Sequence, residues 1–91
     1  MTDCLILCAD IKRATNLFKA LIGHFANLGI KLRVDRARRE FSILTTDIRV
    51  VTEEELHMKC KAGFRGKVIS EKDAWRMLDE EKRRLNKQEE V

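Results

Sequence analysis

The chain has 91 residues, of which 44% are hydrophobic and 37% charged, and it carries a formal net charge of +4. A chain of this length forms one small domain, here expected to span residues 1–91, and no apolar run approaches the ~20 residues of a transmembrane helix. The first residues lack the basic segment and cleavage site of a signal peptide, and an odd number of cysteines argues against a closed set of disulfides. These features exclude a membrane-spanning protein and a disulfide scaffold, so we expect a cytoplasmic protein with no membrane partner.

The first predicted elements are a strand over residues 4–9 and a helix over residues 11–28. Both faces of the strand are apolar, which is typical of a strand inside a sheet that is covered on both sides. Apolar residues then recur at helical spacing and form one wide stripe. Asp10 is placed to cap the start of this helix, and Gly29 to end it in a left-handed conformation.

Three strands with short connections are predicted next. Apolar and polar residues alternate over residues 30–35, and a second strand follows over residues 41–45 after a turn within residues 35–39. Thr46 and Asp47 are predicted to form a tight reversal before a third, β-branched strand over residues 48–52. Because the connections are short, we expect these neighbours to be antiparallel.

Two capping pairs predict the remaining helices. Thr52 and Glu55 have capping-box spacing, which indicates a short helix from residue 53 to about residue 62. A basic loop over residues 64–67 and a very short strand at residues 68–69 follow. Ser70 and Asp73 form the second capping pair, which opens a helix over residues 71–86 whose charged end reaches residue 88.

These elements predict an α/β fold: a small mixed β-sheet, with a central parallel pair and an antiparallel hairpin, covered by two main helices. We expect the first helix to cover one face of the sheet and the last helix to cover part of the other face. The single tryptophan, Trp75, is expected to close the small core together with Leu78.

The order of these elements, together with the stretch Phe64-Arg65-Gly66-Lys67-Val68-Ile69-Ser70-Glu71, resembles part of a P-loop ATPase core over residues 4–75. The pattern is similar to that of large phage terminases and superfamily-two helicases, in which an Arg-Gly loop leads into the Walker B strand. The chain has no Gly-x-x-x-x-Gly-Lys-Ser/Thr loop to hold phosphates. Ser70 stands where that family has its magnesium-binding aspartate, while Glu71 matches the glutamate that activates water. The resemblance therefore implies a reduced module without ATP hydrolysis, from a phage or another mobile element.

Two clusters of basic residues are the candidate binding site. They consist of Arg33, Arg36, Arg38 and Arg39 in the first hairpin, and of Lys59, Lys61, Arg65 and Lys67 around the later loop. Phosphate groups bind such cations, and the arginine fork matches phosphate oxygens bidentately. The alternative interpretation is a solvated hairpin edge whose positive charge discourages aggregation between strands.

The sequence patterns for metal binding and catalysis are weaker. His57 and Cys60 have the spacing of half a zinc site, but Cys4 and Cys8 lie among apolar residues, where we expect buried thiols. His24 has no neighbouring nucleophile motif and is expected at the surface. The sequence thus predicts no metal site, no cofactor and no catalytic residues.

We expect a non-catalytic binding module that acts through its basic hairpin and loop on nucleic acid or on a nucleic-acid-processing protein. The alternative is a protein-targeting inhibitor of a host defence nuclease, similar in action to an anti-CRISPR protein, or a structural adaptor. An exposed edge strand and a projecting last helix are both compatible with a homodimer.

Overall fold

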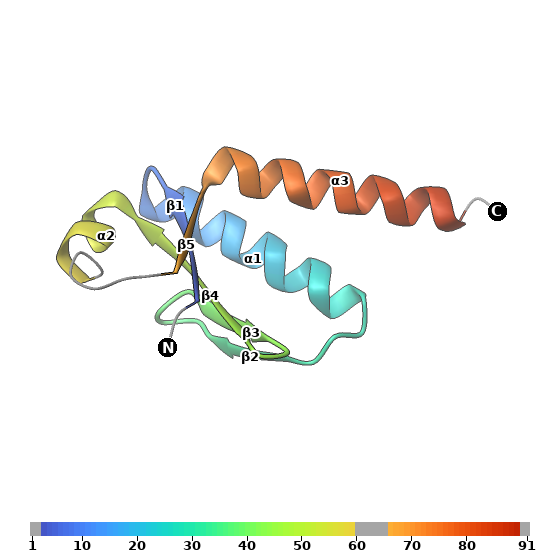
Figure 1. Ribbon diagram of the computed structural model, residues 1–91, viewed down its shortest axis with the longest axis horizontal. Helices are drawn as coiled ribbons and strands as arrows, with labels where there is room; N and C mark the ends of the chain where they lie inside the picture. Colours follow the sequence, from blue (N-terminus) through green and yellow to red (C-terminus); the bar gives the residue numbers. More distant parts are fainter. Residues whose placement is uncertain (1–2, 60–65, 90–91) are drawn as a thin grey trace.

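The molecule has a five-stranded sheet with two long helices on one of its faces (Figure 1). The structure is a computed structural model that describes residues 3–59 and 66–89. The strands are β1 (Cys4–Cys8), β2 (Leu32–Asp35), β3 (Glu40–Ile43), β4 (Thr46–Thr52) and β5 (Lys67–Ser70). The helices are α1 (Ile11–Asn27), α2 (Glu53–Lys59) and α3 (Glu71–Glu89). The predicted α/β class is confirmed.

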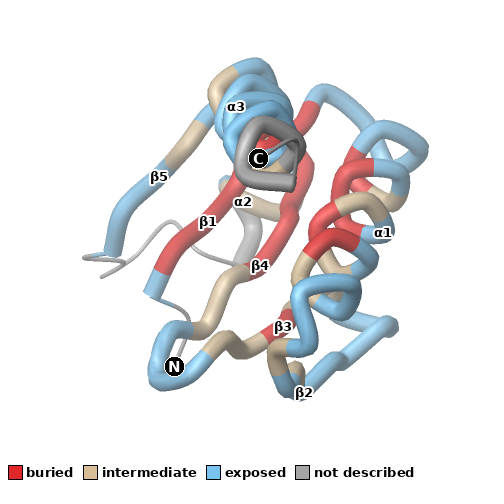
Figure 2. The backbone as a smooth tube through the Cα atoms, turned by 90° about the vertical axis from the view of Figure 1, so that its right-hand side faces the viewer, coloured by how far each residue is buried: buried red, intermediate tan, exposed pale blue. Residues whose placement is uncertain are grey.

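The sheet has the order β2-β3-β4-β1-β5 and contains both parallel and antiparallel pairs. β1 is parallel to β4 and also to β5, while β2, β3 and β4 form an antiparallel series. The predicted parallel centre and antiparallel hairpin are therefore confirmed, and the parallel part has a third strand, β5. β1 lies inside the sheet, and the apolar character of both its faces explains why Leu5 and Ile6 are both buried (Figure 2).

α1 begins and ends where the sequence predicts. The N–H of Arg13 donates to Asp10 Oδ1 at 2.8 Å, which caps the first turn. Gly29 follows the helix with a φ of 77°, the left-handed conformation that glycine adopts without a steric penalty. The apolar stripe of the helix, which includes the buried Leu17 and Phe18, packs onto the sheet.

The prediction that the two main helices cover opposite faces is wrong, because α3 packs on the same face as α1. Ala74 and Leu78 of α3 belong to the same core cluster as Ile6 of β1 and Leu17 of α1. The two helices run side by side in the same direction (Figure 1). The opposite face is covered in part by α2, which contacts β4 and β1.

Two side chains, His24 of α1 and Trp75 of α3, differ from the prediction in how far they are buried. His24, expected at the surface, is only 6% exposed, and its Nε2 lies 2.9 Å from Glu81 Oε2 on α3. Trp75, expected in the core, is 37% exposed, and its indole N–H donates to Glu71 Oε2 at 3.2 Å. Both differences have the same cause, since the packing of α3 beside α1 decides which side chains are enclosed between the two helices.

The β3–β4 reversal is formed by Leu44 and Thr45, and not by Thr46 and Asp47 as predicted. Asp47 instead belongs to β4, where its N–H donates to Asp3 Oδ2 at 3.0 Å and its carboxylate accepts a hydrogen bond from the Ser42 hydroxyl. These cross-strand contacts hold Asp47 in the sheet and move the turn towards the N-terminus.

Candidate functional site

The β2–β3 hairpin carries the first predicted basic cluster. Arg33 is exposed on the edge strand β2, and Arg36 and Arg38 are exposed in the turn that follows. The backbone of Arg38 is fixed on both sides: its N–H donates to Asp35 Oδ1 at 3.2 Å, and its carbonyl accepts from Arg49 Nε at 3.0 Å. The hairpin therefore presents the side chains of Arg36 and Arg38 to solvent from a turn with a defined backbone.

Arg39, the fourth arginine of this cluster, is directed towards the sheet. Its φ of 52° is left-handed, and its side chain is only 12% exposed. The guanidinium donates from Nε to the Val50 carbonyl at 3.1 Å and forms an ion pair with Glu55. Arg39 thus holds the turn against β4 and α2, whereas Arg36 and Arg38 point outward.

Glu55 connects this turn to the interior of the protein. Its Oε2 lies 3.4 Å from a terminal guanidinium nitrogen of Arg49, a residue that is only 7% exposed. The predicted capping box is confirmed, because the Glu55 N–H donates to Thr52 Oγ1 at 3.3 Å and the Thr52 N–H donates to Glu55 Oε1 at 3.2 Å. Sequence reasoning did not single out Arg49, although a lone arginine inside a β-branched strand indicates a buried ion pair.

The charge of Arg33 lies near a carboxylate. A hydrogen bond from the Ser42 hydroxyl, and further the nearby positive charge of Arg33, lower the pKa of Asp47. Arg33 and Asp47 come from strands on either side of β3, each in register with Ser42. Asp47 therefore offsets part of the positive potential of β2, and the turn carries the more exposed positive charge.

The structure does not bring the described members of the two basic clusters together. Lys67 is exposed at the start of β5, at the opposite edge of the sheet from β2. With about 4.8 Å between neighbouring strands, these two edges are separated by roughly 19 Å. Lys59 ends α2, but its side chain lies outside the described part of the chain, as do Lys61 and Arg65.

The thiols of Cys4 and Cys8 are free and buried, as predicted. Burial raises the pKa of Cys8 to about 11, and burial likewise raises the pKa of Cys4. Both thiols thus stay protonated at neutral pH, a poor state for a metal ligand or a nucleophile. Across the described residues no three potential metal ligands lie together, and Cys60 of the half-site with His57 is outside them.

Ser70 and Glu71, the residues compared above with a Walker B region, lie at the junction of β5 and α3. Ser70 ends β5 and caps α3 through its hydroxyl, which accepts from the Asp73 N–H at 3.2 Å. The carboxylate of Glu71 lies 3.8 Å from a guanidinium nitrogen of Arg13 and also accepts from the Trp75 indole. In this conformation both residues make contacts that stabilise the junction of the two helices with the sheet.

Comparison with known proteins gives no relative: no family model, no curated protein and no solved structure matches this chain. No helix within residues 3–59 and 66–89 has both the length and the apolar character needed to cross a membrane. The function must therefore be argued from the hairpin itself.

Proposed function

We propose that this chain is a non-catalytic binding module whose β2–β3 turn contacts the phosphate backbone of nucleic acid. The proposal rests on a difference between the arginines of the β2–β3 turn. Arg39 is fixed by an ion pair with Glu55, while Arg36 and Arg38 are exposed and form no ion pair with any residue in the described part of the chain. Two exposed arginines on a turn with a defined backbone can donate to phosphate oxygens.

The rigid turn makes this contact favourable. Little backbone freedom is lost on binding, because Asp35, Arg49 and Glu55 already hold the turn on both sides. Phosphate contacts carry no sequence information, so the expected binding does not depend strongly on base sequence. It weakens with salt, since each neutralised phosphate releases counterions.

The test is a titration of labelled duplex DNA and of labelled RNA with the full chain, followed by fluorescence anisotropy at several salt concentrations. The double variant Arg36→Glu/Arg38→Glu is expected to bind much more weakly. It should also reduce the slope of log K against log salt for duplex DNA by about 1.8, since each phosphate contact contributes ~0.9.

The matched control is Lys12→Glu/Lys19→Glu, which changes the net charge equally at two exposed positions of α1. We expect this control to keep the salt slope of the natural chain. An equal loss in both double variants would mean that only net charge matters, and would contradict a site at the turn. Failure to bind DNA and RNA even at low salt would reject the proposal and favour the alternative partner, an acidic surface on a nucleic-acid-processing protein.

A further inference from the structure

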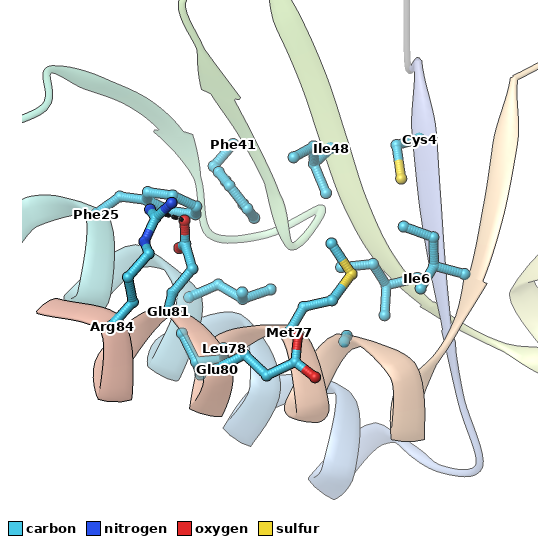
Figure 3. Close-up of a pocket in the computed structure, with 13 residues that line it drawn as sticks. Cys4, Ile6, Phe25, Phe41, Ile48, Met77, Leu78, Glu80, Glu81 and Arg84 are labelled. Carbon is cyan, nitrogen blue, oxygen red and sulfur yellow. Dashed lines mark ion pairs between the residues drawn. The ribbon is translucent and has the colours of Figure 1, made fainter. Parts of the chain in front are cut away.

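A cavity of about 420 Å³ lies between α3, α1 and the sheet, outside the basic hairpin. Figure 3 shows Cys4 and Ile48 projecting from neighbouring strands towards α3, whose Met77 and Leu78 face them. Leu21 and Phe25 of α1 close one side. The volume of the cavity falls within the ~300–1,000 Å³ typical of ligand pockets, which are likewise mostly apolar.

The cavity exists because α3 does not continue its apolar stripe over this part of the sheet. Ala74 and Leu78 pack into the core, and the next residue on the same side of the helix, one turn on, is Glu81. The Glu81 carboxylate lies 2.9 Å from His24 Nε2 on α1, so it does not fill the space above Cys4 and Ile48. A leucine at position 81 would cover this part of the sheet, and with glutamate there the surface remains open.

The mouth of the cavity has an acidic character. Glu81 lies 3.5 Å from a guanidinium nitrogen of Arg84, which leaves this pair close to neutral. Glu80 also lines the cavity, is exposed, and forms no ion pair with any of the described residues. Among the described residues that line the cavity, Glu80 is thus the charged group without an ion-pair partner, while Lys67 and Asp3 act with opposite charges on Cys4 at the floor.

The surroundings favour a small molecule as the occupant. A specific protein interface buries about 800 Å² on each partner. Of the apolar residues that line the cavity, Met77 is the one that is more than a third exposed, at 52%, and its neighbours at the mouth are charged. A small apolar molecule can be enclosed by the cavity itself. A docked helix would also need an apolar surface around the mouth, because one whole face of the helix has to be buried.

We propose that this cavity binds a small amphipathic cation, with its apolar part between α3 and the sheet and its positive group beside Glu80. The inference is independent of the function proposed for the hairpin, since it involves none of its arginines. Because the carboxylate is exposed, we expect the charge preference to be modest, about two- to fivefold in affinity.

The experiment compares two amphiphiles with the same alkyl chain, octyltrimethylammonium and octyl sulfate, below their micelle-forming concentrations. Binding to the full chain is followed by NMR of methyl-labelled methionine and isoleucine. We expect octyltrimethylammonium to shift Met77 and Ile48, which line the cavity, and to leave Ile11 and Ile30 unchanged. Octyl sulfate is expected to bind this site more weakly.

Three variants separate the parts of the proposal. Glu80→Gln should remove the preference for the cation, and the control Asp79→Asn, on the same helix but outside the cavity, should keep it. Cys4→Leu extends a floor residue into the space and should abolish binding of both amphiphiles. If Cys4→Leu does not fold, Met77→Trp at the exposed mouth tests the same point with less risk to the core.

Three results would overturn the inference. Shifts that are equal at Ile11 and Met77 would show non-specific association, and the cavity would not be a binding site. Equal affinity for the cation and the sulfate at Met77, or a preference that Glu80→Gln leaves unchanged, would reject the role of the carboxylate. Retained amphiphile binding in Arg36→Glu/Arg38→Glu distinguishes this site from the hairpin.

Discussion

At the scale of single residues, the Glu55 carboxylate links three segments of the chain. Its two oxygens contact Arg39 in the β2–β3 turn, Arg49 in β4 and the Thr52 N–H at the start of α2. The Arg49 side chain is only 8% exposed, and the Glu55 carboxylate offsets its charge in the interior. Glu55 is therefore one of the residues that hold the proposed binding turn in place, together with Asp35 and Arg49.

We predict that Glu55→Ala lowers the free energy of unfolding by about 3 kcal/mol, because removing one member of a largely buried ion pair leaves the other charge uncompensated. Glu55→Gln keeps the capping hydrogen bonds and should cost less. The measurement is urea unfolding followed by circular dichroism, with Glu54→Ala at the exposed neighbouring position as the control. A loss below about 0.5 kcal/mol for Glu55→Ala would show that the arginines are adequately solvated without Glu55.

At the same scale, sequence position alone does not reveal what an arginine does. Arg36, Arg38 and Arg39 look equivalent in the sequence, yet the first two are exposed and the third is paired with Glu55. The partner of Arg39 lies 16 residues away in the chain. No local pattern encodes that contact, because it forms only when the turn packs against the end of β4.

At the scale of elements, the β3–β4 turn contains a residue in an unfavourable conformation. Leu44 has a φ of 55°, in the left-handed region that costs a residue with a side chain about 1 kcal/mol or more. Its side chain is 91% exposed, so it gains little from packing. The turn is thus held in place by the pairing of β3 with β4 and not by its own residues.

We predict that Leu44→Gly raises the free energy of unfolding by about 0.5–1 kcal/mol, since glycine adopts this conformation without a steric penalty. Leu44→Ala is the matched control, because it also removes the exposed apolar side chain but retains the strain. Thermal and urea unfolding of both variants decide the question. A gain in Leu44→Ala as large as that in Leu44→Gly would assign the effect to the lost side chain instead.

At the scale of the whole molecule, the strand order places two thiols in the interior. β1 is paired on both sides, by β4 and β5, and it carries Cys4 and Cys8 into the face that α1 and α3 cover. Cys8 is 1% exposed. Burial disfavours the thiolate in the folded chain, which couples folding to proton binding.

We predict that the free energy of unfolding falls as the pH rises from about 9 to about 11. Cys8 has a pKa of about 11 when folded and an ordinary value of 9.0, so in this interval the unfolded chain loses a proton that the folded chain retains. Below pH 9, where Cys8 is protonated in both states, the full free energy of unfolding is retained. Each such thiol contributes at most about 1.4 kcal/mol per pH unit.

Urea unfolding of the natural chain and of Cys8→Ala between pH 7.5 and 10.5 tests this. The natural chain should lose more stability with pH than the variant, in which the other titrating groups are unchanged. The absence of tyrosine removes one other group that titrates in this range. Parallel pH dependences would mean that Cys8 titrates normally in the folded state.

The sequence by itself determined the class of fold and most of its elements. The doubly apolar strand, the stripe of α1 and the caps at Asp10, Thr52 and Ser70 are all local features, in which one to four residues along the chain set the conformation. For the same reason these elements were predicted with boundaries close to those observed.

The tertiary structure alone decided how the elements face one another. The side of the sheet that α3 covers, the burial of His24 and the exposure of Trp75 all depend on the packing of α3 beside α1. The separation of Lys67 from the arginines follows from the strand order. The apolar cavity forms where Glu81 follows Leu78 on the side of α3 that faces the core. Such contacts join residues far apart in the chain, so the spacing of residue types along the sequence cannot specify them.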